Sequence, residues 1–381
     1  MNQTQTSFQE ISGNHTGNQE RVISLHQVKK VFETDAGPFT ALKNISIDFN
    51  RGEFIGVTGK SGSGKSTLIN MITGIDHPSD GEIRVGDIVL NQLSESDMAR
   101  WRGKNLGIVF QFYQLLPMLS LFENILLPMD LSDVIPFEER EERAMWLLER
   151  VGLEAYADKM PSEISGGQQQ TVAVARSMAN DPSIVIADEP TGNLDSKTAE
   201  RVFSLFEQMK EEGKTIIMIT HDPALANRTS RQVVISDGEI IHPLLHQHMR
   251  SLAHPLLLQA THALQSVSIE PGQPLFQSGE SIDDVYFVEN GMVSVWVENN
   301  KGQREEVARL DEGNVLGEIE MLRNLPAQAT IIPTNGTSVQ LQKLSRSMFS
   351  ELLEYDAVVK TSFSKLAQDR FTENQRVRAT L

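Results

Sequence analysis

Two kinds of hydrophobic pattern occupy the first half of the chain. "VISLHQV" (22–28) and "ALKNISIDF" (41–49) alternate apolar and polar residues, which is typical of antiparallel strands with one exposed face. "FIGV" (54–57), "SIVIA" (183–187) and "TIIMIT" (215–220) are short and continuously apolar. Such runs favour strands that are buried on both faces of a parallel sheet. The two patterns together predict an α/β fold with a mixed sheet and an antiparallel β subdomain.

Residues 97–180, between the first two buried runs, carry mostly helical patterns. The stretch "EEREERAMWLLERVG" (138–152) has an acidic first turn and a closing Gly152, which mark a helix start and stop. We therefore expect a helical insertion of about residues 97–180 in the α/β core.

The pattern changes near His242. Residues 244–260 contain Pro255 and are interpreted as a linker running into a helix. After Ser266 come short alternating strands punctuated by glycines, which favour a small β-roll, and residues 348–371 form one amphipathic helical pattern with which the chain ends. These features predict domains at 21–243 and 261–381.

Composition limits the class of protein. The chain has 381 residues, enough for two domains, and its net charge of -17 argues against nucleic acid as a partner. It has no cysteine, which excludes disulfides, thiol catalysis and cysteine-ligated zinc. Residues 1–20 are polar and are expected to be a disordered tail, not a signal peptide. No apolar run approaches the roughly 18 residues that span a bilayer, so any work at a membrane is expected from its side.

The segment "GKSGSGKST" (59–67) has the pattern of a phosphate-binding loop. It follows the strand "FIGVT" and opens the helix "KSTLINMIT", the context that the G-x-x-x-x-G-K-[ST] pattern requires. Its glycines let backbone N–H groups point at phosphate oxygens, its lysine reaches the β- and γ-phosphates, and its serine supplies a hydroxyl to Mg²⁺. The residues expected to bind ATP here are Gly59, Lys60, Ser61, Gly62, Ser63, Gly64, Lys65, Ser66 and Thr67.

Three polar residues follow the other two buried runs. Asp188 ends one strand, where a carboxylate can hold magnesium through water, and the adjacent Glu189 can orient or deprotonate an attacking water. His221 follows "TIIMIT" at the same kind of strand end and is placed to contact a γ-phosphate. A polar residue of this kind at a strand end is common and by itself indicates little. Together with the phosphate-binding loop, these residues point to a specific nucleotide site. Lys65, Glu189 and His221 are the predicted catalytic residues.

A second anion site is predicted at "EISGGQQQ" (163–170). Ser165 is placed to cap a helix whose apolar ladder begins at Val172, and Gly166 and Gly167 permit close approach of a ligand to free N–H groups. Because this helix belongs to the helical insertion, we do not expect it to reach the ATP of its own chain. Ser165, Gly166, Gly167 and Gln168 are instead expected to close over ATP that a second copy holds, in a head-to-tail dimer.

These motifs resemble those of ATP-binding cassette (ABC) ATPases, in order and spacing, over residues 20 to about 240. "FQFYQLLPMLSLFENILLPM" and "ADEPTGNLDSKT" look most like the ATPases of lipoprotein-release and macrolide-export type transporters. The resemblance implies a P-loop NTPase fold, stacking of Phe32 on adenine, a magnesium and γ-phosphate contact for Gln111, and a place for Asp195 on the dimer contact. The family's usual tyrosine is Phe32 here, and its usual arginine after the signature is Thr171.

The resemblance also implies a separate membrane permease as partner, contacted by the segment after Gln111 from the cytoplasmic face of the membrane. The expected activity is ATP hydrolysis to ADP and phosphate, with Mg²⁺ held by Ser66, Gln111 and Asp188. Two alternatives remain open: a soluble ABC ATPase without a transport role, and an ABC regulator gated by a cyclic nucleotide. A regulatory protein with an inactive ATPase is opposed by the complete set of Lys65, Asp188, Glu189 and His221.

Residues 255–370 resemble the cyclic-nucleotide-binding β-roll. "GNVLGEIEML" fits the family's phosphate-binding cassette. The resemblance implies that Gly317 lies in a turn and that Glu318 binds the ribose hydroxyl. The family's phosphate-binding arginine falls on Ala327, so cyclic-nucleotide binding is doubtful and a docking or dimerisation role is favoured. Ligand binding stays as the alternative. A cyclic-nucleotide-dependent transcription factor is opposed because only about 35 residues follow the roll.

Overall fold

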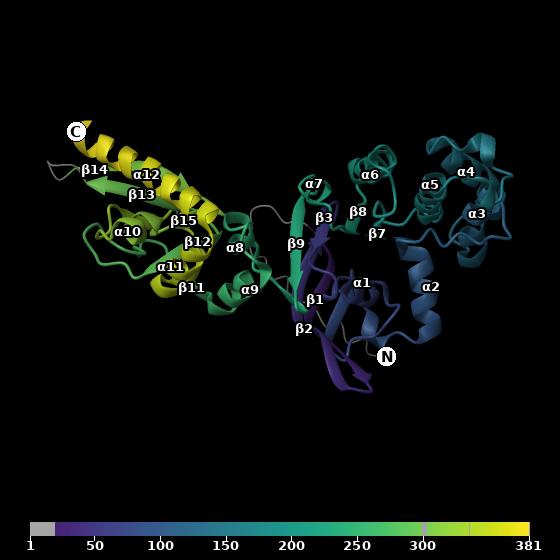
Figure 1. Cartoon of the computed structure of the whole chain (residues 1–381), viewed down its shortest axis with the longest axis horizontal. Coiled ribbons are helices and arrows are strands. Elements are labelled where there is room, and N and C mark those ends of the chain that lie inside the picture. The colour runs from purple at the N-terminus through teal and green to yellow at the C-terminus, as the bar shows by residue number, and fades with distance from the viewer. Residues whose placement is uncertain (1–19, 299–302, 335, 381) are drawn as a thin grey trace, which may run out of the picture. The chain divides into compact units, whose positions relative to one another are not determined.

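The computed structural model describes residues 20–298, 303–334 and 336–380 (Figure 1). The chain divides into two units. One joins the residues up to Val57 with Lys65–Arg231, and the other joins Thr58–Gly64 with the residues from Gln232 onward. The disordered tail predicted for residues 1–20 lies outside the described residues, apart from Glu20.

An antiparallel sheet in the first unit matches the alternating patterns. The long strands β1 (Arg21–Thr34) and β2 (Gly37–Asn50) pair along most of their length, with β4 (Asp80–Val85) on the other side of β1. The short β5 (Ile88–Val89) completes the order β2-β1-β4-β5. The inward positions of the alternating pattern form the buried face of this sheet, as expected for strands with one exposed face.

The continuously apolar runs form parallel strands in the same unit. They are β3 (Phe54–Thr58), β7 (Ile184–Asp188) and β8 (Thr215–Ile219), and the strand order is β3-β8-β7-β6 with β6 at Leu106–Val109. Every residue of β8 is buried, as the pattern predicted. Because these strands are parallel, their carboxyl ends all lie at one edge of the sheet.

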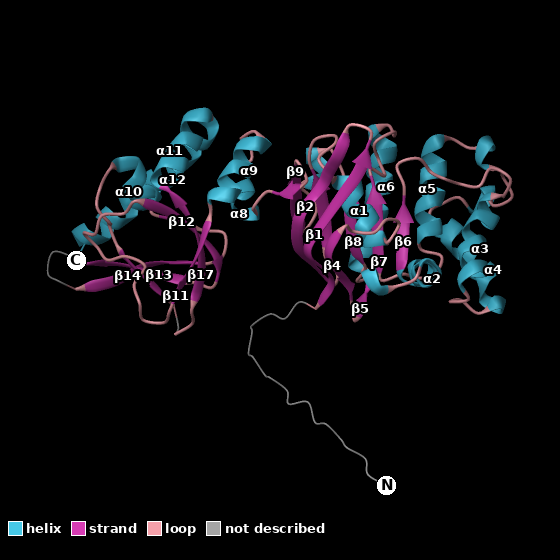
Figure 2. Cartoon of the chain, turned by 90° about the horizontal axis from the view of Figure 1, so that it is seen from below, coloured by secondary structure: helices cyan, strands magenta, loops and turns pink. Residues whose placement is uncertain are grey.

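Figures 1 and 2 show helices beside this sheet, with α3, α4 and α5 gathered in one group. Helices α3, α4 and α5 pack on one another, and α5 also contacts β6 and α6. Phe203 of α6 stacks on Phe54 of β3 with ring centroids 5.3 Å apart, at the centre of the core. The helices of this unit are α1 (Lys65–Thr73), α2 (Glu95–Asn105), α3 (Leu121–Ser132), α4 (Phe137–Arg150), α5 (Gly166–Ser177), α6 (Ser196–Glu211) and α7 (Pro223–Ala226), with 3₁₀ turns at Leu90–Gln92, Glu154–Tyr156 and Pro161–Glu163.

The helical insertion contains one strand that the pattern missed. Residues 97–180 were interpreted as mostly helical, but β6 within them pairs with β7 as part of the parallel sheet. Its sequence "LGIV" is only four residues long and directly follows α2, so it gives no separate signal. The strand β6 therefore separates α2 from the helices α3, α4 and α5 of this stretch.

The second unit contains a β-roll of two antiparallel sheets. One has the strand order β11-β17-β12-β15 and the other β14-β13-β16. The apolar positions between the sheets form one buried cluster that includes Val293, Leu341 and Ile331. The strands are β11 (Gln265–Ile269), β12 (Asp284–Asn290), β13 (Val293–Glu298), β14 (Arg304–Leu310), β15 (Val315–Leu316), β16 (Thr330–Pro333) and β17 (Val339–Ser345).

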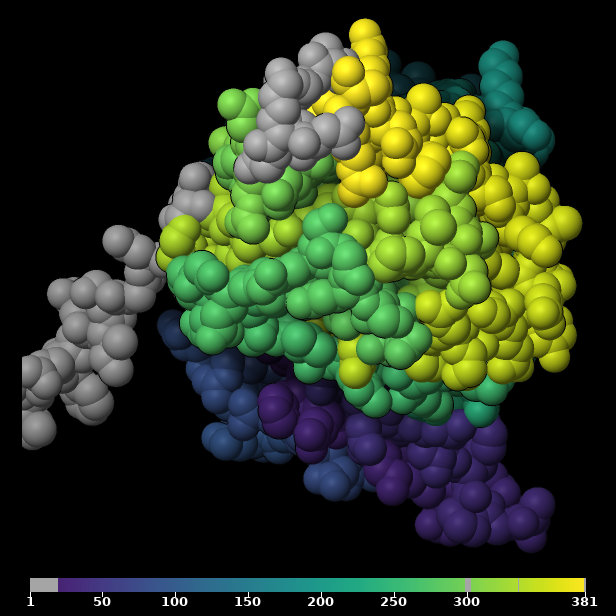
Figure 3. All heavy atoms as spheres, turned by 90° about the vertical axis from the view of Figure 1, so that its left-hand side faces the viewer, coloured from purple at the N-terminus to yellow at the C-terminus, as the bar shows by residue number. Residues whose placement is uncertain are grey.

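Helices pack on the outer face of this roll and form a second core. The buried side chains of this core come from β12 and the helices, and they include Val234 of β9 (Arg231–Ser236), a strand that pairs with β10 (Glu239–Ile240). In the space-filling view, the yellow atoms of the C-terminal helices lie against the green atoms of the strands (Figure 3). The helices are α8 (Pro243–His248), α9 (His254–Ala263), α10 (Glu318–Arg323), α11 (Arg346–Tyr355) and α12 (Ala357–Thr380).

Two predictions about this unit need correction. The segment 244–260, interpreted as a linker running into a helix, is helical over most of its length. Its Pro255 lies in the first turn of α9, and Pro243, just before the segment, lies in the first turn of α8, where the missing N–H is not needed. The C-terminal amphipathic pattern forms two helices, because Asp356 ends α11 with an extended backbone and then accepts the N–H groups of Val358 and Val359 at the start of α12.

Candidate functional site

Two predicted catalytic residues and two predicted magnesium ligands lie at the edge where the parallel strands end. Asp188 is the last residue of β7, and Glu189 follows it directly. Gln111 and His221 each lie two residues after the ends of β6 and β8. The sheet order therefore brings together residues that are more than one hundred positions apart in the sequence.

The phosphate-binding loop of residues 59–64 has the backbone that its glycines allow. Gly59, Gly62 and Gly64 all have positive φ angles, of 149°, 77° and 106°. A Cβ atom on Gly59 would lie 2.2 Å from the carbonyl oxygen of Ile235, whereas one on Gly62 would meet open space. The hydroxyl of Ser63 is buried and has no hydrogen-bond partner among the described residues. A phosphate oxygen would supply the missing acceptor, so the loop fits a nucleotide phosphate.

The start of α1 meets the end of β7. Ser66 donates a hydrogen bond to Asp188, and Lys65 is largely buried nearby. Burial raises the pKa of Asp188, and the charge of Glu189 adds to this rise, while the Ser66 hydrogen bond and the Lys65 charge lower that pKa. A hydroxyl beside a carboxylate is an oxygen donor set that suits Mg²⁺.

Glu189 is held in a strained conformation between two partners. Its φ angle is 45°, in the left-handed region, and its backbone N–H bonds to the carbonyl oxygen of Ile219 at 3.0 Å. Its Oε2 lies 3.3 Å from Nε2 of Gln111 and 3.4 Å from Nδ1 of His221. Left-handed backbone at a residue other than glycine costs about 1–3 kcal/mol and is typical of functional sites. This carboxylate is placed to accept a proton from water.

Phe32 presents an aromatic ring on β1. The side chain is 37% exposed, and Nζ of Lys30 lies 4.9 Å from the ring centroid. The ring is therefore available to stack on a planar ligand.

The start of α5 has the capped structure that its sequence predicted. The Ser165 hydroxyl accepts the N–H of Gln168, whose side chain in turn accepts the N–H of Ser165. The glycines are required sterically, because a Cβ atom on Gly166 would lie 2.5 Å from the Tyr113 hydroxyl, and one on Gly167 would lie 2.5 Å from Thr198. Thr171, where the resemblance expects arginine, donates its hydroxyl to the carbonyl of Gly167.

Asp195 caps α6. Its Oδ1 accepts the N–H groups of Lys197 and Thr198 at 3.1 Å, and its Oδ2 accepts the Thr198 hydroxyl at 2.6 Å. These hydrogen bonds, the one from the Thr198 hydroxyl first, lower the pKa of Asp195. The carboxylate is thus held in a fixed position by its own chain.

A groove lies beside the segment that follows Gln111. Its volume is about 770 Å³, and it is bordered by α2, β6, α3 and α5. Leu116 and Leu131 line it with largely exposed apolar side chains, and Arg102 and Arg176 lie among the polar lining residues. In the part of the chain that the structure describes, no helix is long and apolar enough to cross a membrane.

Helix α12 places an arginine beside Glu318, a contact that the sequence did not reveal. Gly317 has φ 85° at the start of α10, and Glu318 is only 2% exposed. Arg370 of α12 pairs with Glu318 at 2.8 Å, from 52 residues away. Ala327 is buried and supplies no charge. The pairing depends on tertiary contact alone, so no local pattern could have revealed it.

Comparison with known proteins shows which families the two parts of the chain resemble. The ABC transporter family profile matches residues 42–192, and the cyclic nucleotide-binding domain profile matches residues 266–356. An uncharacterized ABC transporter ATP-binding protein of Bacillus subtilis, YknY, is 41% identical over 220 residues, which are 58% of this chain and 95% of that protein. The chain belongs to the ABC transporter ATP-binding proteins. It is accordingly an ABC-type ATPase.

Other ABC relatives include proteins with named transport systems. The lipoprotein-releasing system ATP-binding protein LolD 1 of Chlorobium chlorochromatii is 40% identical over 58% of this chain and 91% of its own length. The bacitracin export ATP-binding protein BceA of Halalkalibacterium halodurans is also 40% identical, over 58% and 87%. The solved dimeric structure of the ABC cassette MJ0796 bound to ADP and Pi covers 58% of this chain and 97% of that one, at 38% identity and a TM-score of 0.55.

Proposed function

We propose that this ABC ATPase works as a head-to-tail dimer that drives a separate membrane permease. The observation that carries the proposal is the Glu189 carboxylate, held between Gln111 and His221 at the end of β7. Solved relatives of this cassette are dimeric, and named relatives belong to a lipoprotein-releasing system and to bacitracin export.

The roles of the site residues follow from their chemistry. Phe32 stacks on the adenine ring, and the N–H groups of Gly59, Lys60, Ser61, Gly62, Ser63 and Gly64, with Thr67 at the start of α1, bind the phosphates. Lys65 binds the β- and γ-phosphates as a point charge. Ser66, Gln111 and Asp188 would hold Mg²⁺, which neutralises charge on the phosphate oxygens.

Glu189 is the general base in this proposal. Gln111 and His221 keep its carboxylate in position at 3.3 and 3.4 Å, and the carboxylate takes the proton of the attacking water. His221 also contacts the γ-phosphate. The strained backbone of Glu189 fixes the direction of the side chain before ATP binds.

The second copy completes the site. The capped start of α5 offers the N–H groups that an anion prefers, yet α5 packs on α3, α4, α6 and β6, whereas α1 packs on β2 and β7. Ser165, Gly166, Gly167 and Gln168 of one copy therefore close over ATP held by the other, near Asp195. Hydrolysis removes the γ-phosphate and its charge-assisted hydrogen bonds, so the dimer opens.

The test is the Glu189→Gln variant of the full chain. Glutamine keeps the shape of the side chain but cannot accept the proton, so turnover should fall at least about a hundredfold while ATP binding persists. Because ATP is then not consumed, a stable dimer should accumulate with ATP and Mg²⁺. Phosphate release measures the turnover, and light scattering after size-exclusion chromatography measures the dimer.

The matched control is Glu211→Gln, an exposed glutamate near the end of α6 outside the site. This variant should keep wild-type turnover and show no ATP-dependent accumulation of dimer. A Glu189→Gln chain that stays monomeric with saturating ATP would contradict the dimeric site, and one that hydrolyses ATP normally would remove Glu189 from its role.

The permease is proposed to bind the groove beside the segment after Gln111. A helix of the partner would lay apolar side chains against Leu116 and Leu131, next to the arginines of the groove. The chain would then sit at the cytoplasmic face of the membrane as a peripheral subunit. Its position beside Gln111 would couple the γ-phosphate contact to the permease.

A further inference from the structure

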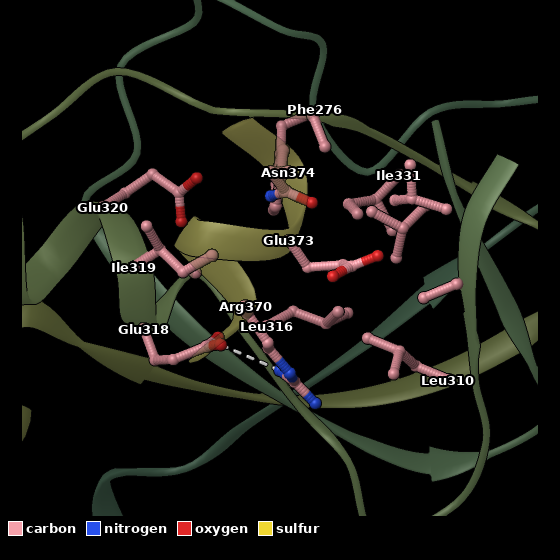
Figure 4. Close-up of a pocket in the computed structure, with 15 residues that line it drawn as sticks. Phe276, Leu310, Leu316, Glu318, Ile319, Glu320, Ile331, Arg370, Glu373 and Asn374 are labelled. Atoms are coloured by element: carbon pink, nitrogen blue, oxygen red, sulfur yellow. Dashed lines mark hydrogen bonds and ion pairs between the residues drawn. The ribbon is translucent and has the colours of Figure 1, made fainter. Parts of the chain in front are cut away.

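A cavity of about 100 Å³ lies inside the C-terminal unit, between the β-roll, α10 and α12 (Figure 4). Polar groups reach it from the two helices: Glu318 and Glu320 from α10, and Arg370, Glu373 and Asn374 from α12. Apolar walls with a few placed polar groups are typical of sites for small molecules. The apolar walls include Phe276, Val295, Val307, Leu310, Leu316 and Ile331.

This cavity is poorly suited to an anion. Among the described residues that line it, Arg370 is the only basic one, and its guanidinium already donates to the Val315 carbonyl, Glu318 and Asn314, at 2.5, 2.8 and 3.2 Å. Ala327 adds no charge where the resemblance to cyclic-nucleotide-binding domains expects an arginine. A phosphate entering the cavity would therefore find carboxylates without a free cation.

Two side chains of α12 have unused hydrogen-bonding capacity. Asn374 is only 6% exposed, and its amide makes no hydrogen bond within the described part of the chain. Glu373, one residue earlier, is exposed, and its carboxylate also has no ion-pair or hydrogen-bond partner among the described residues. Figure 4 shows both side chains among the apolar lining residues. A buried amide normally has a partner, so a missing one points to a ligand.

We propose that the cavity binds a small amine with an apolar body. The apolar body lies against Leu310, Leu316 and Ile331, and the ammonium group donates to the Glu373 carboxylate and to Oδ1 of Asn374. A cationic head satisfies both groups at once, whereas a carboxylate or phosphate head would be repelled by Glu373.

The size of the cavity sets the size of the body. Sites for drug-sized molecules have volumes of about 300–1,000 Å³, whereas an apolar cavity of about 150 Å³ is known to hold benzene. A cavity of about 100 Å³ matches a body of roughly one ring, which is far smaller than a nucleotide. The Glu318–Arg370 pair holds α12 against α10 and keeps the cavity at this size.

The experiment is calorimetric titration of the full chain with four probes: benzylamine, benzyl alcohol, benzoate and cyclic AMP. The first three share one ring and differ in the charge of the head group. Benzylamine should bind saturably, benzyl alcohol about tenfold more weakly because it lacks the charge, and benzoate and cyclic AMP not detectably.

Variants of α12 identify the head-group contact. Glu373→Gln should lower benzylamine affinity about tenfold and leave benzyl alcohol affinity unchanged, because only the ion pair is lost. Asp369→Asn, an exposed change on the same helix outside the cavity, should leave both unchanged. The proposal is overturned if benzoate or cyclic AMP binds as tightly as benzylamine, if benzylamine shows no saturable binding at millimolar concentration, or if Glu373→Gln binds benzylamine like the wild type. No result depends on ATP hydrolysis.

Discussion

At the scale of single residues, two glutamates of α10 show how environment sets an acid's charge. Burial raises the pKa of Glu318, and the charge and hydrogen bond of Arg370 oppose this rise. Burial also raises the pKa of Glu320, opposed by the backbone N–H of Gln328 and reinforced by the charge of Glu318. Both carboxyl groups therefore take up protons more readily in the folded chain than in the unfolded one.

Glu320→Gln tests this pH linkage. Since the folded pKa of Glu320 lies above its unfolded value of 4.5, the stability it contributes is present below pH 4.5 and is lost as pH rises through the folded pKa. Each unit of pKa difference corresponds to about 1.4 kcal/mol. Glutamine does not titrate and keeps an acceptor for Gln328, so the variant should gain stability relative to the wild type as pH rises from about 4.5 to 8.

Thermal unfolding across that pH range measures the effect of Glu320→Gln as a difference from the wild type. Contributions of acids that do not interact with Glu320 cancel in this difference, whereas Glu318, whose charge adds to the rise in the pKa of Glu320, is part of the measured linkage. Glu354→Gln, an exposed change on α11, should give a difference that does not vary with pH. The same flat result for Glu320→Gln would refute the linkage.

The sequence was informative about the residues of the ATP site but not about those of the cavity in the C-terminal unit. The ATP-site residues follow from "GKSGSGKST" and from polar residues at strand ends, because a short loop and a sheet edge fix their positions locally. Arg370 and Asn374 gave no signal, because α12 meets α10 and the β-roll only in the folded chain, and Arg370 pairs with Glu318 from 52 positions away.

At the scale of elements, hydrophobic pattern predicted strands better than it predicted helix ends. Continuous apolar runs became buried strands because both sheet faces are covered. The break between α11 and α12 was missed, since Asp356 interrupts the backbone while the apolar spacing continues across it to Val359 and Phe363. The segment 244–260 was interpreted as a linker running into a helix, but its Pro255 lies in the first turn of α9, where proline is favourable.

The start of α5 yields a prediction about the shared ATP site. Ser165→Glu places a carboxylate where the proposed dimer holds a γ-phosphate, so turnover should fall at least about a hundredfold, as for loss of a donor to a developing charge. ATP binding to the phosphate-binding loop should persist, because the loop belongs to the other copy. Phosphate release and binding of a fluorescent ATP analogue measure the two properties.

A control on a second helix distinguishes the two effects of changing Ser165, which are loss of the helix cap and loss of the proposed phosphate contact. Ser120 caps α3 with the same reciprocal arrangement as Ser165, using Glu123. Ser120→Ala and Ser165→Ala should each lower stability by about 1 kcal/mol, but only Ser165→Ala should slow turnover. Normal turnover in Ser165→Glu would show that this helix start has no part in catalysis.

At the scale of the whole molecule, the proposed scheme makes the chain dependent on partners. In that scheme a second copy completes the ATP site, and a permease binds the groove. Leu131 is 78% exposed on α3. Exposing an apolar side chain to water is unfavourable in free energy, and burial against a partner helix would remove this penalty.

Leu131→Glu is expected to separate the ATPase from its permease without harming the ATPase. The substitution removes the apolar leucine side chain from the contact, and the new carboxylate would have to lose its hydration to be buried there. Recovery of the permease should therefore fall at least about tenfold. The residue lies outside the ATP site, so turnover of the purified chain should stay at the wild-type value. The measurement is affinity purification of the tagged chain from its native membrane, followed by quantification of any multi-span protein that accompanies it.

Phe137→Glu is the matched control for the permease contact, because Phe137 is 75% exposed on α4 but does not line the groove. This variant should recover the multi-span protein as well as the wild type does, since it adds the same charge to the same helical part of the chain. Equal losses in both variants would mean that added charge, and not the groove, weakens the association. If the wild-type chain itself is recovered only from the soluble fraction and alone, the permease partner is refuted, and the ATPase would work without one.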